Sequence, residues 1–189
     1  CHNGHAALFR RARVEIGENG VLIAVMSGNF VQRGLPAVWN KYRRAALLVG
    51  LGVDLVVELP YPWSAAGGEN FARAGVAIAC ALGAENLVFG SETGDVDVLS
   101  AIAARLHTPE TDEKRAEYLR KNPDLGAAAL EDRLCADMGI PPLSANDKLG
   151  LWYIDALSGT DCRPVAVPRL PASDSVTSAS RIREWLYAG

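Results

Sequence analysis

Two histidines with a helical spacing stand at the start of the chain. His2 and His5 are three residues apart, so on a helix that begins here both imidazoles point the same way from the first turn. The N-terminus of a helix attracts phosphate, because its backbone N–H groups are free and its dipole is positive. Asn3 and Gly4 lie between the histidines, and a glycine lets a phosphate approach the backbone closely. A pair of surface histidines would explain an isolated motif of this kind equally well.

A second polar cluster lies near the other end of the sequence. Ser178 and Ser180 precede Arg183 at the start of a predicted helix over residues 178–187. Hydroxyl and N–H groups can hold β- and γ-phosphate oxygens, and a guanidinium can neutralise pyrophosphate as it leaves. A simple N-cap would explain either serine alone. Together with the two histidines, the cluster favours a site for a nucleoside triphosphate.

Weaker candidates follow the first predicted strand. Ser27 and Asn29 stand where the apolar run over residues 21–27 ends, and ligands meet parallel sheets at the carboxyl ends of strands. Arg33 and Lys41 follow in the same segment and could hold a carboxylate or a reacting phosphate. A tight strand-to-loop turn is an equally good interpretation.

The distribution of charge agrees with an anionic ligand. The whole chain has a formal net charge of −3, but residues 1–50 hold seven basic and two acidic residues, so the remainder carries −8. A local positive field suits a nucleoside triphosphate or RNA. Solvated surface arginines remain the commoner explanation for any single one of them.

The elements that must position these residues alternate between strands and helices. Apolar runs of strand length cover residues 21–27, 54–59, 86–89 and 164–167. Helical patterns cover residues 4–13, 40–48, 69–82, 144–157 and 178–187. Residues 96–138 are helical only, divided by Pro109 and Pro123. This order predicts an α/β fold, in which a parallel sheet has helices on both faces and a helical insertion around 96–138.

Composition and cysteine usage exclude several other classes. At 189 residues, with 49% apolar and 22% charged residues, the chain is expected to form a single globular domain over residues 1–189. Its four cysteines are scattered and form no Cys-x-x-Cys pair, so neither a zinc ribbon nor a disulfide framework is indicated. No apolar stretch approaches the ~20 residues of a membrane-spanning helix. We expect a cytoplasmic protein with no membrane partner.

Longer strings carry a resemblance to a known family. The H-x-G-H and S-x-S-x-I-R motifs are similar to the two signatures of the nucleotidyltransferase superfamily. Within it, residues 23–36 (IAVMSGNFVQRGLP) and 52–60 (GVDLVVELP) closely resemble the tRNA(Met) cytidine acetate ligases. Residues 89–92 (FGSE) and 143–146 (LSAN), with Leu149 and Gly150, follow the same family's pattern in the same order. The resemblance runs along nearly the whole chain.

The resemblance implies a Rossmann-like fold and a reaction in two steps. Acetate attacks the α-phosphate of ATP to give acetyl-adenylate and pyrophosphate, and the acetyl group then passes to N4 of the wobble cytidine of elongator tRNA(Met). ATP, acetate and this tRNA would be the partners, and Mg²⁺ is the usual companion of ATP. The resemblance places His2 and His5 at the phosphates, with Gly90 bordering the adenosine. It also places Asn146 and Arg169 where the family binds ATP.

Two departures from the family pattern bear on these expectations. The family has a strand leading into H-N-G-H and a mostly helical, tRNA-holding region after the S-x-S-x-I-R helix, and residues 1–189 show neither. A domain of this extent could make acetyl-adenylate yet fail to acetylate tRNA. Two alternatives stay open: a small-molecule adenylyl- or cytidylyltransferase of the same fold, and a non-catalytic module that binds nucleotide or RNA.

Overall fold

The computed structural model describes residues 3–17 and 19–169, apart from the side chains of Asn3 and Arg33. The described residues form two compact units. Unit 1 comprises residues 3–65 and Arg169, and unit 2 comprises residues 66–168. The single domain expected over residues 1–189 stays a prediction.

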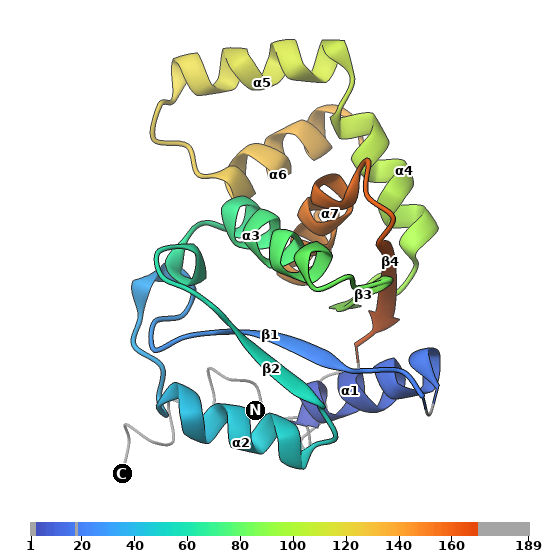
Figure 1. Ribbon diagram of the computed structural model, residues 1–189. Helices are drawn as coiled ribbons and strands as arrows, with labels where there is room; N and C mark the ends of the chain where they lie inside the picture. Colours follow the sequence, from blue (N-terminus) through green and yellow to red (C-terminus); the bar gives the residue numbers. More distant parts are fainter. Residues whose placement is uncertain (1–2, 18, 170–189) are drawn as a thin grey trace. The chain divides into compact units, whose positions relative to one another are not determined.

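Unit 1 is built on a pair of parallel strands (Figure 1). Its elements, in chain order, are α1 (Asn3–Ile16), β1 (Ile23–Ser27), the 3₁₀ turn η1 (Gln32–Gly34), α2 (Lys41–Gly50), β2 (Leu55–Leu59) and the 3₁₀ turn η2 (Trp63–Ala65). Strands β1 and β2 pair over their full length, from Ile23 opposite Leu55 to Ser27 opposite Leu59. The crossover between them is α2, as the sequence predicts for a parallel pair.

An ion pair anchors α1 beside the amino ends of both strands. Arg13 lies 2.6 Å from Asp54 and also donates to the carbonyl oxygens of Gly20 and Gly52, at 2.8 and 2.7 Å. The backbone N–H of Leu22 donates to the same Asp54 carboxylate at 2.7 Å. This backbone hydrogen bond, and then the one from Arg13, lower the pKa of Asp54 below its ordinary value. The carboxylate therefore joins the turns that precede β1 and β2 to one helix.

Unit 2 holds a second parallel pair and most of the helices. Its elements are α3 (Gly68–Ala81), β3 (Asn86–Ser91), α4 (Val96–Leu106), α5 (Pro109–Lys121), α6 (Ala127–Asp137), α7 (Ala145–Leu157) and β4 (Arg163–Pro168). Strand β3 pairs with β4 from Asn86 opposite Arg163 to Ser91 opposite Pro168. Helix α7 packs on both strands and on α3 and α4.

The predicted helical insertion contributes to the apolar core of unit 2. Leu99 of α4 and Leu134 of α6 are fully buried in one cluster with Phe89 of β3 and Leu151 of α7. Pro109 begins α5, and Pro123 lies between α5 and α6, so the two prolines divide the segment as the sequence predicts. Helices α4 and α6 therefore share one apolar core with β3 and α7.

The order and type of the described elements confirm the α/β prediction. The four described strands form two parallel pairs, β1–β2 and β3–β4, where the sequence pattern predicts one sheet. The helix predicted over residues 178–187 lies outside the described residues. No helix in the described part of the chain is long and apolar enough to span a membrane. Within the described residues, Cys80, Cys135 and Cys162 are free thiols.

Candidate nucleotide site

Helix α1 begins at the predicted histidine motif. Asn3 is its first residue, and no acidic residue lies in its first turn. His5 is exposed in that turn, and its ring stacks on Phe9 one turn further along, with centroids 6.5 Å apart and planes at 24°. Gly4 is half-buried. His2 lies outside the described residues, so the structure places only one of the two imidazoles at this helix start.

The carboxyl edge of β1 and β2 carries a network of polar side-chain and backbone groups. We call it the β1–β2 edge, and its residues are Ser27, Gly28, Asn29, Lys41, Arg44 and Glu58. The side chain of Asn29 accepts a hydrogen bond from the backbone N–H of Lys41 at 3.2 Å. The carbonyl oxygen of Asn29 accepts another from Ala37 at 2.8 Å. Asn29 therefore closes the loop over residues 28–40 and holds the first residue of α2 beside the end of β1.

Lys41 points its ammonium at the end of the neighbouring strand. Its Nζ lies 2.6 Å from a carboxylate oxygen of Glu58, the penultimate residue of β2. The hydrogen bond to Glu58 is the main reason that the pKa of Lys41 is raised, so the ammonium stays charged. A β-carbon added to Gly28 would lie 2.1 Å from the other oxygen of Glu58. The ion pair therefore needs a glycine at this position.

Arg44 ties both ends of the same loop to the strand. Its guanidinium donates to the carbonyl oxygen of Ser27 at 3.0 Å, to that of Gly28, and to that of Trp39 at 3.1 Å. Burial lowers the pKa of Arg44 from its ordinary value. Because its donors are directed at backbone oxygens, Arg44 shapes the loop, whereas Lys41 is the cation this edge can direct at an anion.

The carboxyl edge of β3 and β4 is organised by carboxylates, and we call it the β3–β4 edge: Gly90, Ser91, Glu92, Ser144, Asn146 and Asp147. Ser144 is the N-cap of α7, and its hydroxyl accepts from the backbone N–H of Asp147 at 3.0 Å. The same hydroxyl oxygen lies within hydrogen-bond distance of the carboxylates of Glu92 and Asp147. The side-chain amide of Asn146 donates to Glu92 at 2.9 Å.

Asp147 is the buried centre of this edge, with 4% of its surface exposed. Ser91 donates its hydroxyl to the carboxylate, and the backbone N–H of Thr93 donates at 3.2 Å. The Ser91 hydroxyl oxygen in turn accepts from the backbone N–H of Gly94 at 2.9 Å. Burial by itself raises the pKa of Asp147, but the hydrogen bonds from Ser91, Thr93 and Ser144 together bring it below its ordinary value. The turn after β3 is thus fixed to the start of α7.

Two predicted ATP-binding residues come together at the β3–β4 edge. Gly90 is the penultimate residue of β3, and Asn146 bonds to Glu92, two residues further along. Gly90 lies opposite Val167 in the strand pairing, and Arg169 follows Pro168, the last residue of β4. Arg169 is exposed.

The structure tests only part of the predicted set. Asn29 and Lys41 meet within unit 1, and Ser27 ends β1 beside them. Arg33 lies in η1, without a described side chain. Ser178, Ser180 and Arg183 lie outside the described residues. The catalytic and binding roles of all these residues stay predictions.

Sequence reasoning leaves Ser91 and Asp147 out of the site, and it offers Arg44 and Glu58 only as general candidates, for contact with phosphate or RNA and for orienting a ligand or capping a helix. Asp147 had a readable signal, because Ser-x-x-Asp at a helix start is the spacing of a capping box and applies to Ser144 and Asp147. The contacts of Arg44 had no such signal in the sequence, because its acceptors are backbone oxygens.

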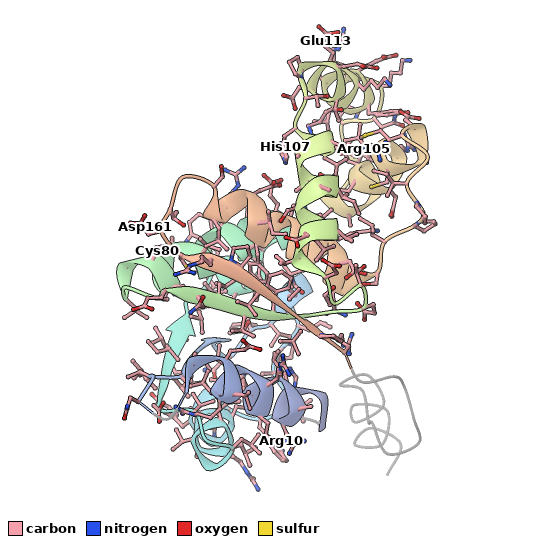
Figure 2. All side chains as sticks on the ribbon, turned by 90° about the vertical axis from the view of Figure 1, so that its right-hand side faces the viewer. Arg10, Cys80, Arg105, His107, Glu113 and Asp161 are labelled. Carbon is pink, nitrogen blue, oxygen red and sulfur yellow. The ribbon has the colours of Figure 1, made fainter. Side chains whose placement is uncertain are left out.

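A cavity of about 190 Å³ lies elsewhere in unit 2, among α4, α5 and α6. Figure 2 shows Arg105 and His107 toward the end of α4, next to this region. Arg105 donates to the carbonyl oxygen of Met138 at 2.9 Å, and Asp137 accepts from Tyr118 at 2.7 Å. His107 lies 2.7 Å from Asp155 of α7. These contacts join helices, and no predicted site residue lines the cavity.

The described residues contain no group of three or more His, Cys, Asp or Glu that could hold a metal ion. A magnesium ion carried by nucleotide phosphates needs only one or two protein carboxylates. Mg²⁺ therefore stays a prediction for this chain.

Known proteins resemble the chain along nearly its whole length. It is 37% identical over 206 residues to the tRNA(Met) cytidine acetate ligase of Syntrophotalea carbinolica, covering 100% of this chain and 48% of the relative. It is 35% identical over 191 residues to the ligase of the same name from Pediococcus pentosaceus, covering 96% of this chain and 49% of the relative. The chain thus spans about half the length of the curated relatives it matches.

Solved structures agree with the fold. A crystal structure of Thermotoga maritima TmcAL bound with alpha-thio ATP has a TM-score of 0.80 at 32% identity, over 99% of this chain and 47% of that chain. The apo form of the same protein has a TM-score of 0.81 at 32% identity, over 99% of this chain and 49% of that chain. Residues 1–189 also match the family described as HIGH Nucleotidyl Transferase. The fold prediction is confirmed, and the chain belongs to the HIGH nucleotidyl transferase family.

Proposed function

We propose that this chain carries the ATP-dependent, acetate-activating site of a tRNA(Met) cytidine acetate ligase. The observation that carries the proposal is the likeness, over 96–100% of the chain, to relatives that bear this name. The likeness to TmcAL solved with alpha-thio ATP supports ATP as the nucleotide. The free thiols of Cys80, Cys135 and Cys162 fit a protein that acts in the reducing cytoplasm.

The proposed reaction brings together reactants of like charge. A carboxylate oxygen of acetate attacks the α-phosphorus of ATP, the bond from that phosphorus to the bridging oxygen breaks, and pyrophosphate leaves. N4 of the tRNA cytidine then attacks the acetyl carbonyl carbon, AMP leaves, and N4 loses a proton. The first step needs cations and N–H groups that position two anions and stabilise the charge on the departing pyrophosphate.

The groups suited to these anions belong to unit 1. We assign the phosphates to the start of α1, with His2, Asn3, Gly4 and His5, and acetate or the reacting phosphate to Ser27, Asn29, Arg33 and Lys41. Lys41 supports this assignment, because Glu58 fixes its ammonium at a strand end while 30% of the side chain stays exposed. The predicted roles of Ser178, Ser180 and Arg183 at the departing pyrophosphate belong to the same proposal.

The groups suited to the nucleoside lie at the β3–β4 edge. A carboxylate only accepts hydrogen bonds at neutral pH, so Glu92 suits hydroxyl or amine donors and repels phosphate. Asn146 can both donate and accept, and Gly90 has no side chain that would keep a ring system from the strand. We assign Gly90 and Asn146 to the adenosine, and the exposed Arg169 to the ATP phosphates.

The test is ATP–pyrophosphate exchange that depends on acetate. Labelled pyrophosphate should enter ATP when the protein, magnesium and acetate are present, and exchange should fall to background without acetate or with excess chelator. A folded protein that binds ATP but gives no exchange would overturn the proposal. Exchange stimulated by a phosphorylated metabolite and not by acetate would assign the chain to small-molecule nucleotidyl transfer instead.

A pair of lysine variants links the exchange to the proposed site. Lys41→Gln removes the ammonium at the β1–β2 edge and should lower the exchange rate by about 100-fold, the scale of losing one charged stabilising group. Lys121→Gln is the matched control, since Lys121 also pairs with a glutamate but lies on the exposed face of α5. Equal rates in the two variants would remove Lys41 from the site.

A further inference from the structure

The exposed aromatic residues of the described chain are concentrated in one part of unit 1. Phe30, Trp39, Tyr42, Tyr61 and Trp63 are between 39% and 76% exposed. Every other described Phe, Trp or Tyr, in either unit, is buried or half-buried. We call these five residues the aromatic surface. Exposing so much ring area in one segment has a cost in water, so it indicates a binding function.

The five residues lie in the segments that follow the carboxyl ends of β1 and β2. The rings of Phe30 and Tyr61 are 6.1 Å apart and tilted by 60°. The turns η1 and η2 also pack on each other. The backbone of Trp39 is held to the end of β1 through Arg44, which bonds to the carbonyl oxygens of both Trp39 and Ser27. Separate stretches of sequence therefore meet at one edge of the strand pair.

The exposed apolar residues at the other edge of the strands are of a different type. Val21, Leu51 and Leu55 stand close to the amino ends of β1 and β2, and all three are exposed aliphatic residues. Aromatic rings are thus concentrated at the carboxyl edge, where parallel strands present their ligands.

Basic residues accompany the rings in sequence, and the neighbouring carboxylate of Glu58 is engaged by Lys41. Residues 28–51 and 60–65 contain four basic residues and no Asp or Glu. The Arg43 guanidinium lies 4.7 Å from the centroid of the Trp39 ring, and the Lys41 ammonium lies 5.5 Å from that of Tyr42. Lys41 is paired with Glu58, so Arg43 is the cation of this pair that can meet a phosphate while the flat rings offer stacking faces.

We propose that the aromatic surface, with Arg43, binds unpaired nucleotides of RNA. Bases that are not stacked in a helix can stack on exposed rings, and their phosphates meet the neighbouring guanidinium. That this RNA is the tRNA substrate of the acetylation rests on the proposed function. The surface would hold the nucleotides around the target cytidine at the edge where the β1–β2 strands present Lys41.

The binding test uses a labelled RNA hairpin whose loop contains unpaired cytidine, and a blunt duplex of the same stem. In fluorescence anisotropy, the hairpin should bind more tightly than the duplex. Tyr42→Leu and Trp63→Leu, which remove a ring but keep an apolar side chain, should each weaken hairpin binding by about 10-fold. Tyr42→Phe keeps the ring and should bind as the unmodified chain does.

Charge is tested with a second pair of variants. Arg43→Gln should lower the slope of log Kd against log salt by about 0.7, the value for one phosphate contact with a single strand. Arg73→Gln is the control, because Arg73 is an exposed helical arginine of unit 2. An unchanged slope for Arg43→Gln, or the same reduced slope in both variants, would contradict the proposed role of Arg43.

The outcomes separate this inference from the proposed function. Acetate-dependent exchange needs no RNA, so Trp63→Leu should exchange normally while its hairpin binding falls. Equal affinity for hairpin and duplex, or no effect of losing the ring, would overturn the inference and leave the exchange result intact. Ring-dependent binding to anionic lipid vesicles or to a second copy of the chain, in place of RNA, would overturn it too.

Discussion

The two strand pairs end in opposite chemistry. At the β1–β2 edge a cation organises the backbone, because the Arg44 guanidinium donates to three carbonyl oxygens. At the β3–β4 edge an anion has this role, because the buried Asp147 carboxylate accepts from hydroxyl and N–H donors. Arg44 connects the end of β1 to the next α-helix, α2, whereas Asp147 connects the end of β3 to the start of α7, which is distant in sequence.

The difference decides what each edge has left to offer a ligand. At the β1–β2 edge the first N–H groups of α2 bond to Asn29 and Asn40, so Lys41 remains as the group for an anion. At the β3–β4 edge the Ser144 hydroxyl caps α7, and the charged group is the Glu92 carboxylate, which accepts from Asn146. One edge therefore favours phosphate or carboxylate, and the other favours hydroxyl or amine groups. Variants of the two organising residues, Arg44 and Asp147, test this contrast.

The largest expected loss of stability is at the β3–β4 edge. Asp147→Ala should lower the free energy of unfolding by about 3 kcal/mol, since it removes hydrogen bonds to a charged acceptor and leaves buried donors unpaired. Urea titration followed by circular dichroism measures the change. Asp124→Ala, at an exposed position between α5 and α6, is the control and should change stability by less than ~0.5 kcal/mol. Similar losses in the two variants would show that Asp147 does not organise its edge.

The expected loss of stability at the β1–β2 edge is somewhat smaller. Arg44→Ala is expected to cost about 2 kcal/mol, because three backbone oxygens lose a charged donor but can still reach water at a half-buried site. Hydrogen exchange should rise mainly in the loop over residues 28–40. Arg44→Lys should recover only part of the lost stability and protection, since one ammonium cannot match the spread of the guanidinium donors. Arg10→Ala, on the exposed face of α1 (Figure 2), should leave the loop protected.

The sequence predicts the elements of both edges well, because local signals determine them. Parallel strands commonly read as continuous apolar runs, and β1 and β2 fall inside the predicted runs over residues 21–27 and 54–59. Asn40 caps α2 as predicted, with its side chain accepting from the backbone N–H of Arg43 at 2.9 Å. These signals depend on neighbours within a few residues.

The organising contacts could not be predicted in the same way. Ser91 and Asp147 are 56 residues apart in sequence, and Lys41 and Glu58 are 17 apart, so only the fold brings each pair together. The sequence identified Asn29 and Lys41 as candidates through their position after a strand. It could not show that Glu58 fixes the Lys41 ammonium, because a glutamate near a strand end has many possible partners.

A smaller effect of Asp147 depends on pH. Because its folded pKa is lowered, the ionised carboxylate stabilises the fold above the ordinary value of 3.8, and this contribution is lost as the pH falls below that value and through the folded pKa. Urea midpoints measured from neutral pH downward should therefore fall more steeply for the unmodified chain than for Asp147→Asn. Asp54 also has a lowered pKa and should account for part of the slope that remains. If the urea midpoints of the unmodified chain and of Asp147→Asn fell in parallel with pH, the role of the Asp147 carboxylate would be contradicted.

The smallest expected effect is at Gly28, and it tests how Lys41 is held. In Gly28→Ala the new methyl group would meet the end of the flexible Glu58 side chain, so the carboxylate should swing away from Lys41. Since exposed ion pairs contribute little, the cost should stay below ~1 kcal/mol. The Michaelis constant for acetate in the exchange reaction should rise several-fold, because the ammonium is no longer fixed.

A double-mutant cycle shows whether Glu58 is the cause. Glu58→Ala removes the atoms that the added methyl group would meet, so Gly28→Ala should then be neutral, or stabilising by about 0.4–1 kcal/mol through its effect on the unfolded chain. The Michaelis constant for acetate should be raised already in Glu58→Ala, and it should not rise again in the double variant. If Gly28→Ala were equally costly in both backgrounds, the glycine would be required by the backbone of the loop, and Lys41 would owe its position to Asn29 and α2 alone.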